Sequence, residues 1–375
     1  MDQLRVGTLG AARITPGALI APARQVPEVV VTAVAARDPA RARRFAAKHG
    51  IPVVHNSYEQ LIADPGVDAI YNPLLNSLHA PWTLRALAAG KHVLCEKPLA
   101  ANEAEAAEVA DAARAAGRVV MEAFHYRYHP LARRMQEIVA GQLGELRHVE
   151  AALCFPLPRF SDIRYRFDLA GGATMDAGCY PINCIRMLGP GEPAVVSARA
   201  RLHAPEVDRA MVATFRFDGG VTGRIRASLW SGQLLRIGAR AVGERGEMRV
   251  LNYLAPQSFS LITVRTGGST RRERVRGEAT YTYQLRAFAG AVLRGEPVIT
   301  TADDAVANMR VIDDVYRAAG LAVRGTAPGT VPGTAPGTGP GTAPGTGPGT
   351  APAAESGIEP GTEPGSEPGS VLGSR

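Results

Sequence analysis

The chain has 375 residues, which is enough for two ordinary domains, and 46% of them are hydrophobic, so each domain can have a core. The formal net charge is +7, and the segment 325–375 carries four glutamates against Arg375, which leaves +10 for the rest. Because the arginines are scattered and no aromatic side chains are interleaved with them, the charge favours attraction for phosphates or anionic substrates over nucleic-acid binding.

The first strand and the turn after it are typical of a dinucleotide-binding fold. Residues 4–10 form an apolar run that ends in Gly10, and residues 11–15 open a helix. Small residues there let backbone N–H groups at the helix N-terminus approach a pyrophosphate. In the G-x-G-x-x-G pattern Ala12 and Thr15 replace the second and third glycines, so an ordinary strand-to-helix turn remains the alternative. The cofactor-binding candidates from this turn are Gly10, Ala11, Ala12, Arg13 and Ile14.

The end of the second strand indicates which nicotinamide cofactor is bound. Residues 29–36 are β-branched and apolar throughout, as in a parallel strand covered on both faces. An acid that binds the ribose is expected at the end of this strand, but Arg37 stands there, and an arginine suits a 2′-phosphate. We therefore predict NADP, with NAD as the second choice. The alternative is that Arg37 faces solvent while Asp38 caps the next helix.

Strands and helices continue to alternate up to residue 123. This pattern predicts an α/β domain, a doubly wound Rossmann domain with a parallel sheet, over residues 1–125. The expected elements are helix 39–49, strand 53–54, helix 57–63, strand 67–71, helix 79–89, strand 92–95, helix 102–116 and strand 119–123.

The strand 92–95 delivers Glu96, Lys97 and Pro98 to its carboxyl end. Ligands of open parallel sheets bind in the crevice outside these strand ends, so Lys97 is the first candidate for catalysis. A solvated lysine at a strand end is the alternative. Pro98 favours an extended backbone at Lys97, and the bond between them is a candidate for the cis form.

Two further strand ends carry polar side chains that could reach the same crevice. One is followed by Asn76 and His79, and the other by the segment 124–130. Among the tyrosines of that segment, Arg127 can bind hydroxyls or a carboxylate. The histidines, taken singly, fit a structural role better. The candidates are Asn76 and His79 for the cofactor, with Tyr126 and Arg127 for the substrate.

From residue 146 the pattern changes to consecutive strands with turn signals such as Asp218-Gly219-Gly220. It predicts a second α+β domain, residues 126–322, built on a mostly antiparallel open sheet. One helix is expected near 173–188, and helices at 281–294 and 302–319 are candidates to pack back on the first domain. The expected strands are 147–155, 194–203, 209–217, 221–230, 234–242, 247–251 and 258–265.

The helix near 173–188 has Asp176, Tyr180 and Asn183 at positions i, i+4 and i+7, which share one face. Such a polar stripe is either a solvated face or the wall of a site. After this domain, residues 323–375 repeat Pro-Gly-Thr and Glu-Pro-Gly units, and we expect a disordered low-complexity tail.

Other sequence features argue against membrane and metal sites. No stretch of about 18 apolar residues occurs, and the first residues lack a basic-then-apolar signal segment. The cysteines form no CxxC and no Cys/His metal spacing. We therefore expect no metal, no membrane segment, and reduced thiols in the cytoplasm. The cysteines are Cys95, Cys154, Cys179 and Cys184.

These motifs together make residues 4 to about 320 resemble the glucose–fructose oxidoreductase / inositol dehydrogenase / rhizopine catabolism (Gfo/Idh/MocA) family. The motifs are Gly7-Thr8-Leu9-Gly10-Ala11-Ala12-Arg13-Ile14, Asn76-Ser77-Leu78-His79, Gly90-Lys91-His92-Val93-Leu94-Cys95-Glu96-Lys97-Pro98 and Asp176-Ala177-Gly178-Cys179-Tyr180. The resemblance implies that Lys97 is the catalytic lysine, commonly followed by a cis bond, that Asp176 is the conserved acid, and that Tyr180 transfers the proton.

The resemblance also implies a branch of the family. Many members carry histidine at the position of Tyr180, whereas the tyrosine resembles the branch with glucose–fructose oxidoreductase, dimeric dihydrodiol dehydrogenase and certain aldose dehydrogenases. It argues against inositol dehydrogenase activity. A homo-oligomer formed through the exposed face of the second sheet is implied as well.

The expected reaction is NADP(H)-dependent hydride transfer at a CH–OH or C=O group of a sugar, polyol or dihydrodiol. We expect the Lys97 ammonium to lower the pKa of Tyr180 and to polarise the substrate oxygen. Asp176 would orient the Lys97–Tyr180 pair or the hydroxyls of the substrate. Glu96 is a further candidate for cofactor binding and Asn183 for substrate binding. Arg13 is the second candidate for binding the 2′-phosphate. A catalytically silent NAD(P)-binding regulator is the alternative function.

Overall fold

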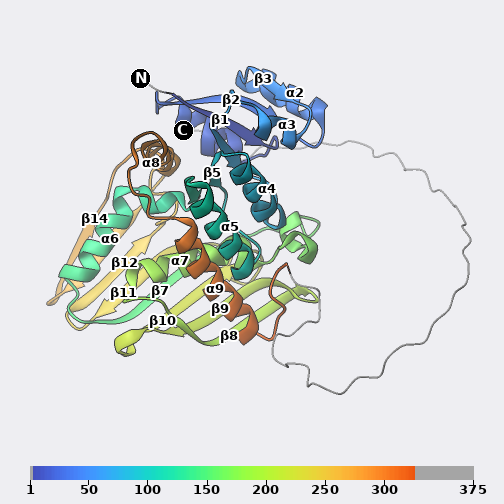
Figure 1. The fold of residues 1–375 in the computed structure, drawn as a ribbon. Coiled ribbons are helices and arrows are strands. Elements are labelled where there is room, and N and C mark those ends of the chain that lie inside the picture. Colours follow the sequence, from blue (N-terminus) through green and yellow to red (C-terminus); the bar gives the residue numbers. More distant parts are fainter. Residues whose placement is uncertain (1–2, 326–375) are drawn as a thin grey trace, which may run out of the picture. The chain divides into compact units, whose positions relative to one another are not determined.

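The computed structural model describes residues 3–325, which form two β-sheets with helices packed against them (Figure 1). The expected tail was placed to start at residue 323, which is too early, because the Arg324 side chain is completely buried. The remainder of that expected segment, residues 326–375, lies outside the described residues. The expected domain boundary near residue 125 stays a prediction.

The first sheet has six strands, all parallel, in the order β3-β2-β1-β4-β5-β6. This order and the alternation with helices confirm the predicted doubly wound fold. The strands are β1 (Leu4–Leu9), β2 (Val29–Ala35), β3 (Val53–His55), β4 (Ala69–Asn72), β5 (His92–Cys95) and β6 (Val120–Glu122). Its helices are η1 (Pro16–Ile20), α1 (Ala21–Ala23), α2 (Pro39–His49), α3 (Tyr58–Ala63), α4 (Asn76–Ala88) and α5 (Glu103–Ala116).

The helices begin and end where local chemistry allows. At α2, the Asp38 side chain accepts a hydrogen bond of 2.8 Å from Ala40 N, so Asp38 caps this helix, as the alternative interpretation of this segment expected. The same helix ends at Gly50, whose φ of 71° only glycine adopts readily. The helix after the glycine turn begins at Pro16, later than the predicted start at residue 11.

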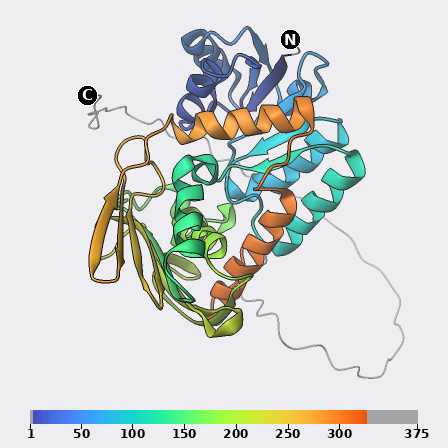
Figure 2. The same ribbon diagram turned by 90° about the vertical axis from the view of Figure 1, so that its left-hand side faces the viewer.

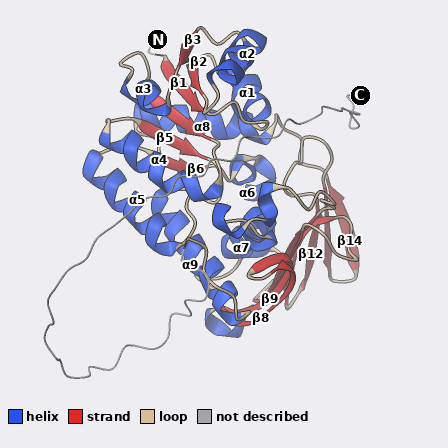
Figure 3. Ribbon diagram, turned by 90° about the vertical axis from the view of Figure 1, so that its right-hand side faces the viewer, coloured by secondary structure: helices blue, strands red, loops and turns tan. Residues whose placement is uncertain are grey.

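Helices cover both faces of this sheet. The long helix α8 (Thr280–Arg294) returns from the C-terminal part of the chain and lies across one face, as Figures 2 and 3 show. There its Leu285 and Phe288 join Leu4, Tyr71 and Leu94 in one buried cluster. The opposite face is covered by α3, α4 and α5. The core of the first sheet therefore depends on Leu285 and Phe288, which come much later in the sequence than any of its strands.

The second sheet has eight strands in the order β14-β13-β12-β11-β7-β10-β9-β8. All neighbours pair antiparallel except β7 and β10, so the predicted mostly antiparallel sheet is confirmed. Its strands are β7 (Leu146–Cys154), β8 (Ala194–Ala204), β9 (Val207–Arg216), β10 (Thr222–Ser228), β11 (Arg236–Gly243), β12 (Gly246–Leu251), β13 (Leu261–Thr266) and β14 (Ser269–Glu273).

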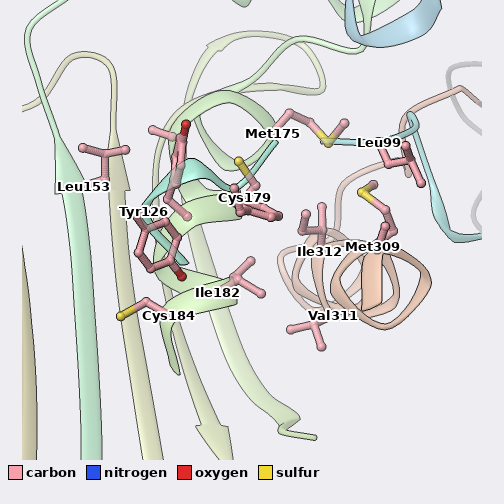
Figure 4. Packing of buried hydrophobic residues seen from close by; sticks show 14 of the residues in the cluster. Leu99, Tyr126, Leu153, Met175, Cys179, Ile182, Cys184, Met309, Val311 and Ile312 are labelled. Atoms are coloured by element: carbon pink, nitrogen blue, oxygen red, sulfur yellow. The ribbon is translucent and has the colours of Figure 1, made fainter. Parts of the chain in front are cut away.

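The helical pieces around this sheet are η2 (His125–Tyr128), α6 (Pro130–Gly141), η3 (Ile163–Tyr165), η4 (Phe167–Leu169), the π-helical turn η5 (Thr174–Gly178), α7 (Cys179–Leu188), η6 (Asp218–Gly220) and α9 (Ala302–Ala318). The sequence analysis missed α6 and β14. In Figure 4, Ile312 of α9 lies on the side of Ile182 of α7, and Met309 of α9 lies beside Leu99. Helix α9 also packs on α5, so it contacts both halves of the chain.

A buried ion pair anchors the start of the helix that carries Asp176. Asp208, from β9, accepts hydrogen bonds of 2.7 Å from both the backbone N and the hydroxyl of Thr174. Its other oxygen lies 3.2 Å from Arg324 Nη2, and both side chains are completely buried. Arg324 also donates to the backbone oxygen of Gly171, at 2.7 Å, so this charge pair fixes the chain just before η5.

We predict that Asp208→Asn lowers the free energy of unfolding by about 3–5 kcal/mol, because removing one charge of a buried pair leaves the other uncompensated. Urea unfolding measures the change. The matched control is Asp168→Asn, which removes an exposed partner of Arg166 and should leave stability unchanged within error. Equal losses in the two variants would contradict the role given to the buried pair.

Candidate active site

Two adjoining cavities lie at the carboxyl ends of the strands of the first sheet. The larger, of about 710 Å³, is lined by residues from both halves of the chain. The smaller, of about 490 Å³, lies over the glycine turn. Ala12, Arg41 and the segment 73–75 line both. This is the position at which ligands of doubly wound sheets bind.

The predicted site residues divide between these cavities. The larger cavity is lined by Ala12, Arg13, Ile14, Asn76, His79, Glu96, Lys97, Asp176 and Tyr180. The smaller cavity is lined by Gly10, Ala11, Ala12 and Arg37. Residues predicted from distant parts of the sequence are thus brought to one place.

The glycine turn is shaped to let a ligand approach the backbone. Gly10 has a φ of 82°, and a Cβ at this position would lie 3.2 Å from Leu74 Cδ2. The next two residues, Ala11 and Ala12, present only methyl groups to the smaller cavity. A larger residue at Gly10 would be strained and would crowd Leu74. The turn therefore fits the phosphates of a dinucleotide despite its two missing glycines.

Two arginines stand at the smaller cavity. Arg37 follows β2 as predicted, and Arg41 lies one helical turn later, with its Nη2 donating to the backbone oxygen of Ala11 at 2.8 Å. Arg13, the second candidate for a phosphate, lines only the larger cavity. Arg41 was not among the predicted residues, because it lies inside α2 and not at a strand end.

His79 and Asn76 connect the cavity wall to the rest of the fold. Both ring nitrogens of the buried His79 face carbonyl oxygens, Pro98 O at 2.7 Å and Leu74 O at 3.1 Å. Burial lowers the pKa of His79 to about 4, so it is neutral and has one N–H to donate. Asn76 Nδ2 donates to Ala170 O at 3.1 Å.

The Lys97 ammonium lies between the two halves of the chain. The Lys97–Pro98 bond is cis, as the sequence analysis anticipated. Nζ donates to the backbone oxygen of Asp176 at 2.9 Å and lies 3.8 Å from its Oδ1. Burial disfavours the charged form, but attraction to Cys179, Asp176 and Glu96 outweighs it and raises the pKa of Lys97. This side chain therefore stays an ammonium at neutral pH.

Tyr180 and Asp176 come from the opposite wall. The Lys97 ammonium lies 4.9 Å from the centre of the Tyr180 ring, over its face. Burial raises the pKa of Tyr180 well above its usual value, and negative neighbours add to the effect. We expected Lys97 to lower this pKa, which is wrong, because the desolvation of the phenol dominates. Asp176 Oδ2 forms an ion pair of 2.9 Å with Arg164 Nε.

Glu96 lines the larger cavity and also bonds to the first sheet. Its Oε1 accepts a hydrogen bond of 2.8 Å from the hydroxyl of Tyr71 in β4. Burial raises the pKa of Glu96, and the bond from Tyr71 opposes this effect. It thus supports the strand end that carries Lys97.

Three predicted substrate residues do not line either cavity. Tyr126 is buried, and its hydroxyl donates to Asn183 Oδ1 at 2.7 Å. Arg127 Nη1 donates to the same oxygen at 3.2 Å. These side chains therefore contact one another behind the wall that Tyr180 forms, and the geometry gives no support to their predicted contact with substrate.

Other residues at the larger cavity come from α8 and from the loop 155–166, which the family resemblance implied as a source of specificity residues. Arg159, Asp162 and Arg164 come from the loop after β7, which pattern analysis left unplaced, and Tyr281 comes from α8. Within residues 3–325, no cluster of three or more His, Cys, Asp or Glu side chains could hold a metal ion. No helix in that range is long and apolar enough to cross a membrane.

A buried carboxyl group supports the loop that follows Lys97. Glu122, the last residue of β6, is completely buried, and its Oε1 accepts a hydrogen bond of 2.9 Å from Leu99 N. Burial, together with the nearby charge of Asp304, raises the pKa of Glu122 to about 8.

Comparison with known proteins places the chain in a family. Residues 4–124 match the model "Oxidoreductase family, NAD-binding Rossmann fold" (GFO_IDH_MocA), and residues 132–249 match its "GFO/IDH/MocA C-terminal domain". The chain is 38% identical over 314 residues to D-xylose 1-dehydrogenase (NADP(+)) 2 of Haloferax volcanii, an alignment that covers 84% of this chain and 96% of that protein.

Two further proteins are similar to this chain, one in sequence over a shorter alignment and one in structure. Trans-1,2-dihydrobenzene-1,2-diol dehydrogenase of Mus musculus is 38% identical over 231 residues, covering 60% of this chain and 68% of its own. The crystal structure of KijD10, a 3-ketoreductase from Actinomadura kijaniata with NADP and TDP-benzene, superimposes with a TM-score of 0.78 at 29% identity. It covers 84% of this chain and 97% of that one.

Fold and site together define an oxidoreductase with a nicotinamide-dinucleotide-binding Rossmann half. More particularly, the chain belongs to the Gfo/Idh/MocA oxidoreductase family, as its motifs predicted.

We predict that the Glu122 carboxyl makes the protein less stable as the pH rises from about 4.5 to 8. In this range the native state keeps a proton on Glu122 that the unfolded chain has lost, so unfolding becomes more favourable with rising pH. In Glu122→Gln the amide oxygen can still accept from Leu99 N, and the slope of stability against pH should flatten. Urea unfolding at several pH values measures it. An unchanged slope, equal to that of the exposed control Glu59→Gln, would contradict the prediction.

Proposed function

We propose that this chain is an NADP(H)-dependent oxidoreductase that interconverts a CH–OH and a C=O group on a sugar, polyol or dihydrodiol. One observation carries the proposal: the Lys97 ammonium and the Tyr180 ring, from opposite halves of the chain, lie 4.9 Å apart at one cavity. The substrates in the names of the xylose and dihydrodiol dehydrogenases support the substrate class. The 3-ketoreductase with bound NADP supports the cofactor.

The residues present fit this cofactor. The small side chains at the glycine turn would hold its pyrophosphate, and Arg37 with Arg41 would bind a 2′-phosphate at the smaller cavity. Asn76, His79 and Lys97 line the adjoining part of the larger cavity, where the nicotinamide would lie. When bound, the cofactor supplies or accepts the hydride.

Tyr180 performs the proton transfer in this proposal. Because its pKa is raised, the side chain is a neutral phenol at neutral pH. A neutral phenol can donate its proton to the oxygen of a carbonyl as that group is reduced, which is general acid catalysis. In the opposite direction the side chain must first lose its proton, and the phenolate oxygen then takes the proton of the alcohol. The raised pKa thus favours the reductive direction for the resting state of the site.

Lys97 stabilises the substrate oxygen. An ammonium close to a carbonyl oxygen stabilises the negative charge that develops there, and the effect is strong in a cavity shielded from water. Asp176 holds the ammonium in place through its backbone oxygen, while its carboxylate pairs with Arg164. These contacts prearrange both charges before substrate binds.

The alternatives are weaker. A catalytically silent NAD(P)-binding regulator would not need Lys97, Asp176 and Tyr180 around one cavity. Binding of nucleic acid rests only on the overall basic charge.

Two further features belong to the proposal. A homo-oligomer would form on the uncovered face of the second sheet, where Leu235 and Leu251 are 71% and 52% exposed. A cytoplasmic location agrees with four cysteines that are buried and unpaired.

We predict that Lys97→Ala and Tyr180→Phe each lower turnover by roughly 10²- to 10⁴-fold, the usual contribution of a general acid–base group. A spectrophotometric screen of aldoses, polyols and dihydrodiols with NADP⁺ and NAD⁺ first identifies the best substrate. NADPH should still bind to both variants in a fluorescence titration. Tyr283 lines neither cavity, so the control variant Tyr283→Phe should keep full turnover. Normal turnover in both site variants would end the assignment.

We predict that Arg37→Asp raises the Kd for NADPH by roughly 10- to 100-fold, since charge-assisted bonds to a phosphate are among the stronger ones. The Kd for NADH should change far less. Arg43→Asp is the control, because Arg43 lies exposed on α2, the helix that follows Arg37, and lines neither cavity. If the preference for NADPH is unchanged, another side chain binds the 2′-phosphate, and Arg41 is then the first candidate.

A further inference from the structure

The hydroxyl of Tyr180 has one hydrogen-bond partner among residues 3–325. That partner is His125 Nε2, at 3.3 Å. His125 lies in η2, directly after the first sheet, and is only 5% exposed. Its ring lies 4.1 Å from that of Tyr281, a residue of the larger cavity. Nothing in the proposed reaction yet uses this histidine.

The other nitrogen of His125 shows which way the hydrogen bonds run. Nδ1 lies 2.7 Å from the hydroxyl oxygen of Thr280, the first residue of α8. Thr280 is completely buried, and its hydroxyl has no other hydrogen-bond partner in the described part of the chain. Its hydrogen must therefore go to Nδ1, since a buried donor without an acceptor is costly.

A neutral imidazole carries one N–H, and burial keeps this ring neutral. Burial, followed by the charge of Lys97, lowers the pKa of His125 to about 3. With Nδ1 accepting from Thr280, the single ring proton resides on Nε2. Hydrogen bonds then run from Thr280 to His125 and from His125 to Tyr180, and every buried donor in the chain of bonds is satisfied.

We propose that His125 is a positioning residue, which donates its Nε2–H to Tyr180 Oη and so turns the hydroxyl hydrogen of Tyr180 toward the cavity. The inference rests on the proposed role of Tyr180 as proton donor. When the Tyr180 O–H bond breaks and its proton bonds to the substrate oxygen, the electron pair stays on Oη. Nε2–H stabilises that phenolate, and a proton from solvent later restores the phenol.

The geometry leaves room for this bond to strengthen. A separation of 3.3 Å is long for a hydrogen bond, and catalytic hydrogen bonds in ligand-free sites often shorten when substrate binds. The rings of Phe124 and Tyr126 also flank Tyr180, so the phenol has little freedom to choose another partner.

Kinetics of paired variants test the proposal in the full chain. His125→Phe keeps an aromatic ring against Tyr281 but removes the donor, and should lower kcat by about 10- to 100-fold with KM and the Kd for NADPH unchanged. His125→Gln should restore most of the loss, because an amide N–H can replace Nε2–H. The control His129→Asn keeps a cap on α6, where His129 Nδ1 accepts from Leu131 N, and should retain kcat.

A double variant separates this effect from mere packing. If His125 acts through the Tyr180 hydroxyl, His125→Phe should cause no further loss in the Tyr180→Phe background. The same loss in both backgrounds, or a His125→Gln variant as slow as His125→Phe, would overturn the proposal. Full turnover in Tyr180→Phe alone would instead refute the proton-donor role, and this inference with it.

A measurement without turnover tests the direction of the bonds. In ¹⁵N NMR of the cofactor-free protein, the chemical shifts of the His125 ring nitrogens should be those of a neutral imidazole protonated on Nε2. They should stay so between pH 5 and 9. The Nε2 signal should shift in Tyr180→Phe. Protonation on Nδ1 would overturn the proposal.

Discussion

The hydrogen bond from Lys97 Nζ to the backbone oxygen of Asp176 is the contact on which the site depends. It joins the loop after β5 to the helical turn of the other half, and it places the ammonium over the Tyr180 ring. Without it, the buried ammonium would lose the peptide oxygen that, together with the carboxylates of Asp176 and Glu96, offsets its desolvation. The same bond therefore stabilises the charge and sets the distance between the two walls of the cavity.

Much of the fold was predictable because its signals are local. The helix 39–49 and the strand 92–95 match the expected ranges, since capping residues and continuous apolar runs define them. Helix α6 was not among the expected elements, although a helix beside His129 was one interpretation of the polar segment 124–130, and His129 does cap α6. Strand β14 was missed because four of its five side chains are exposed, so it has no apolar pattern.

The site was predictable where it is made of strand ends. Parallel strands end at one edge of the sheet, so Arg37 and Lys97 could be placed at one crevice from the sequence alone. Tyr281 and Thr280 could not, because the expected packing of this helix on the first domain does not show which of its residues reach the site. The direction of the Tyr180 pKa shift also escaped prediction, since it depends on how deeply the phenol is buried.

The position of Arg324 has a consequence for where the fold can end. Its guanidinium is the counter-charge of Asp208, and its backbone oxygen accepts a hydrogen bond of 2.9 Å from Asn102, which begins α5. Arg324 thus contacts both the segment before η5, which carries Asp176, and Asn102, the N-cap of α5. A chain shortened to end before residue 324 would lose both contacts and leave the Asp208 carboxylate without its counter-charge. Residue 324 is therefore the earliest point at which the chain could end with these contacts intact.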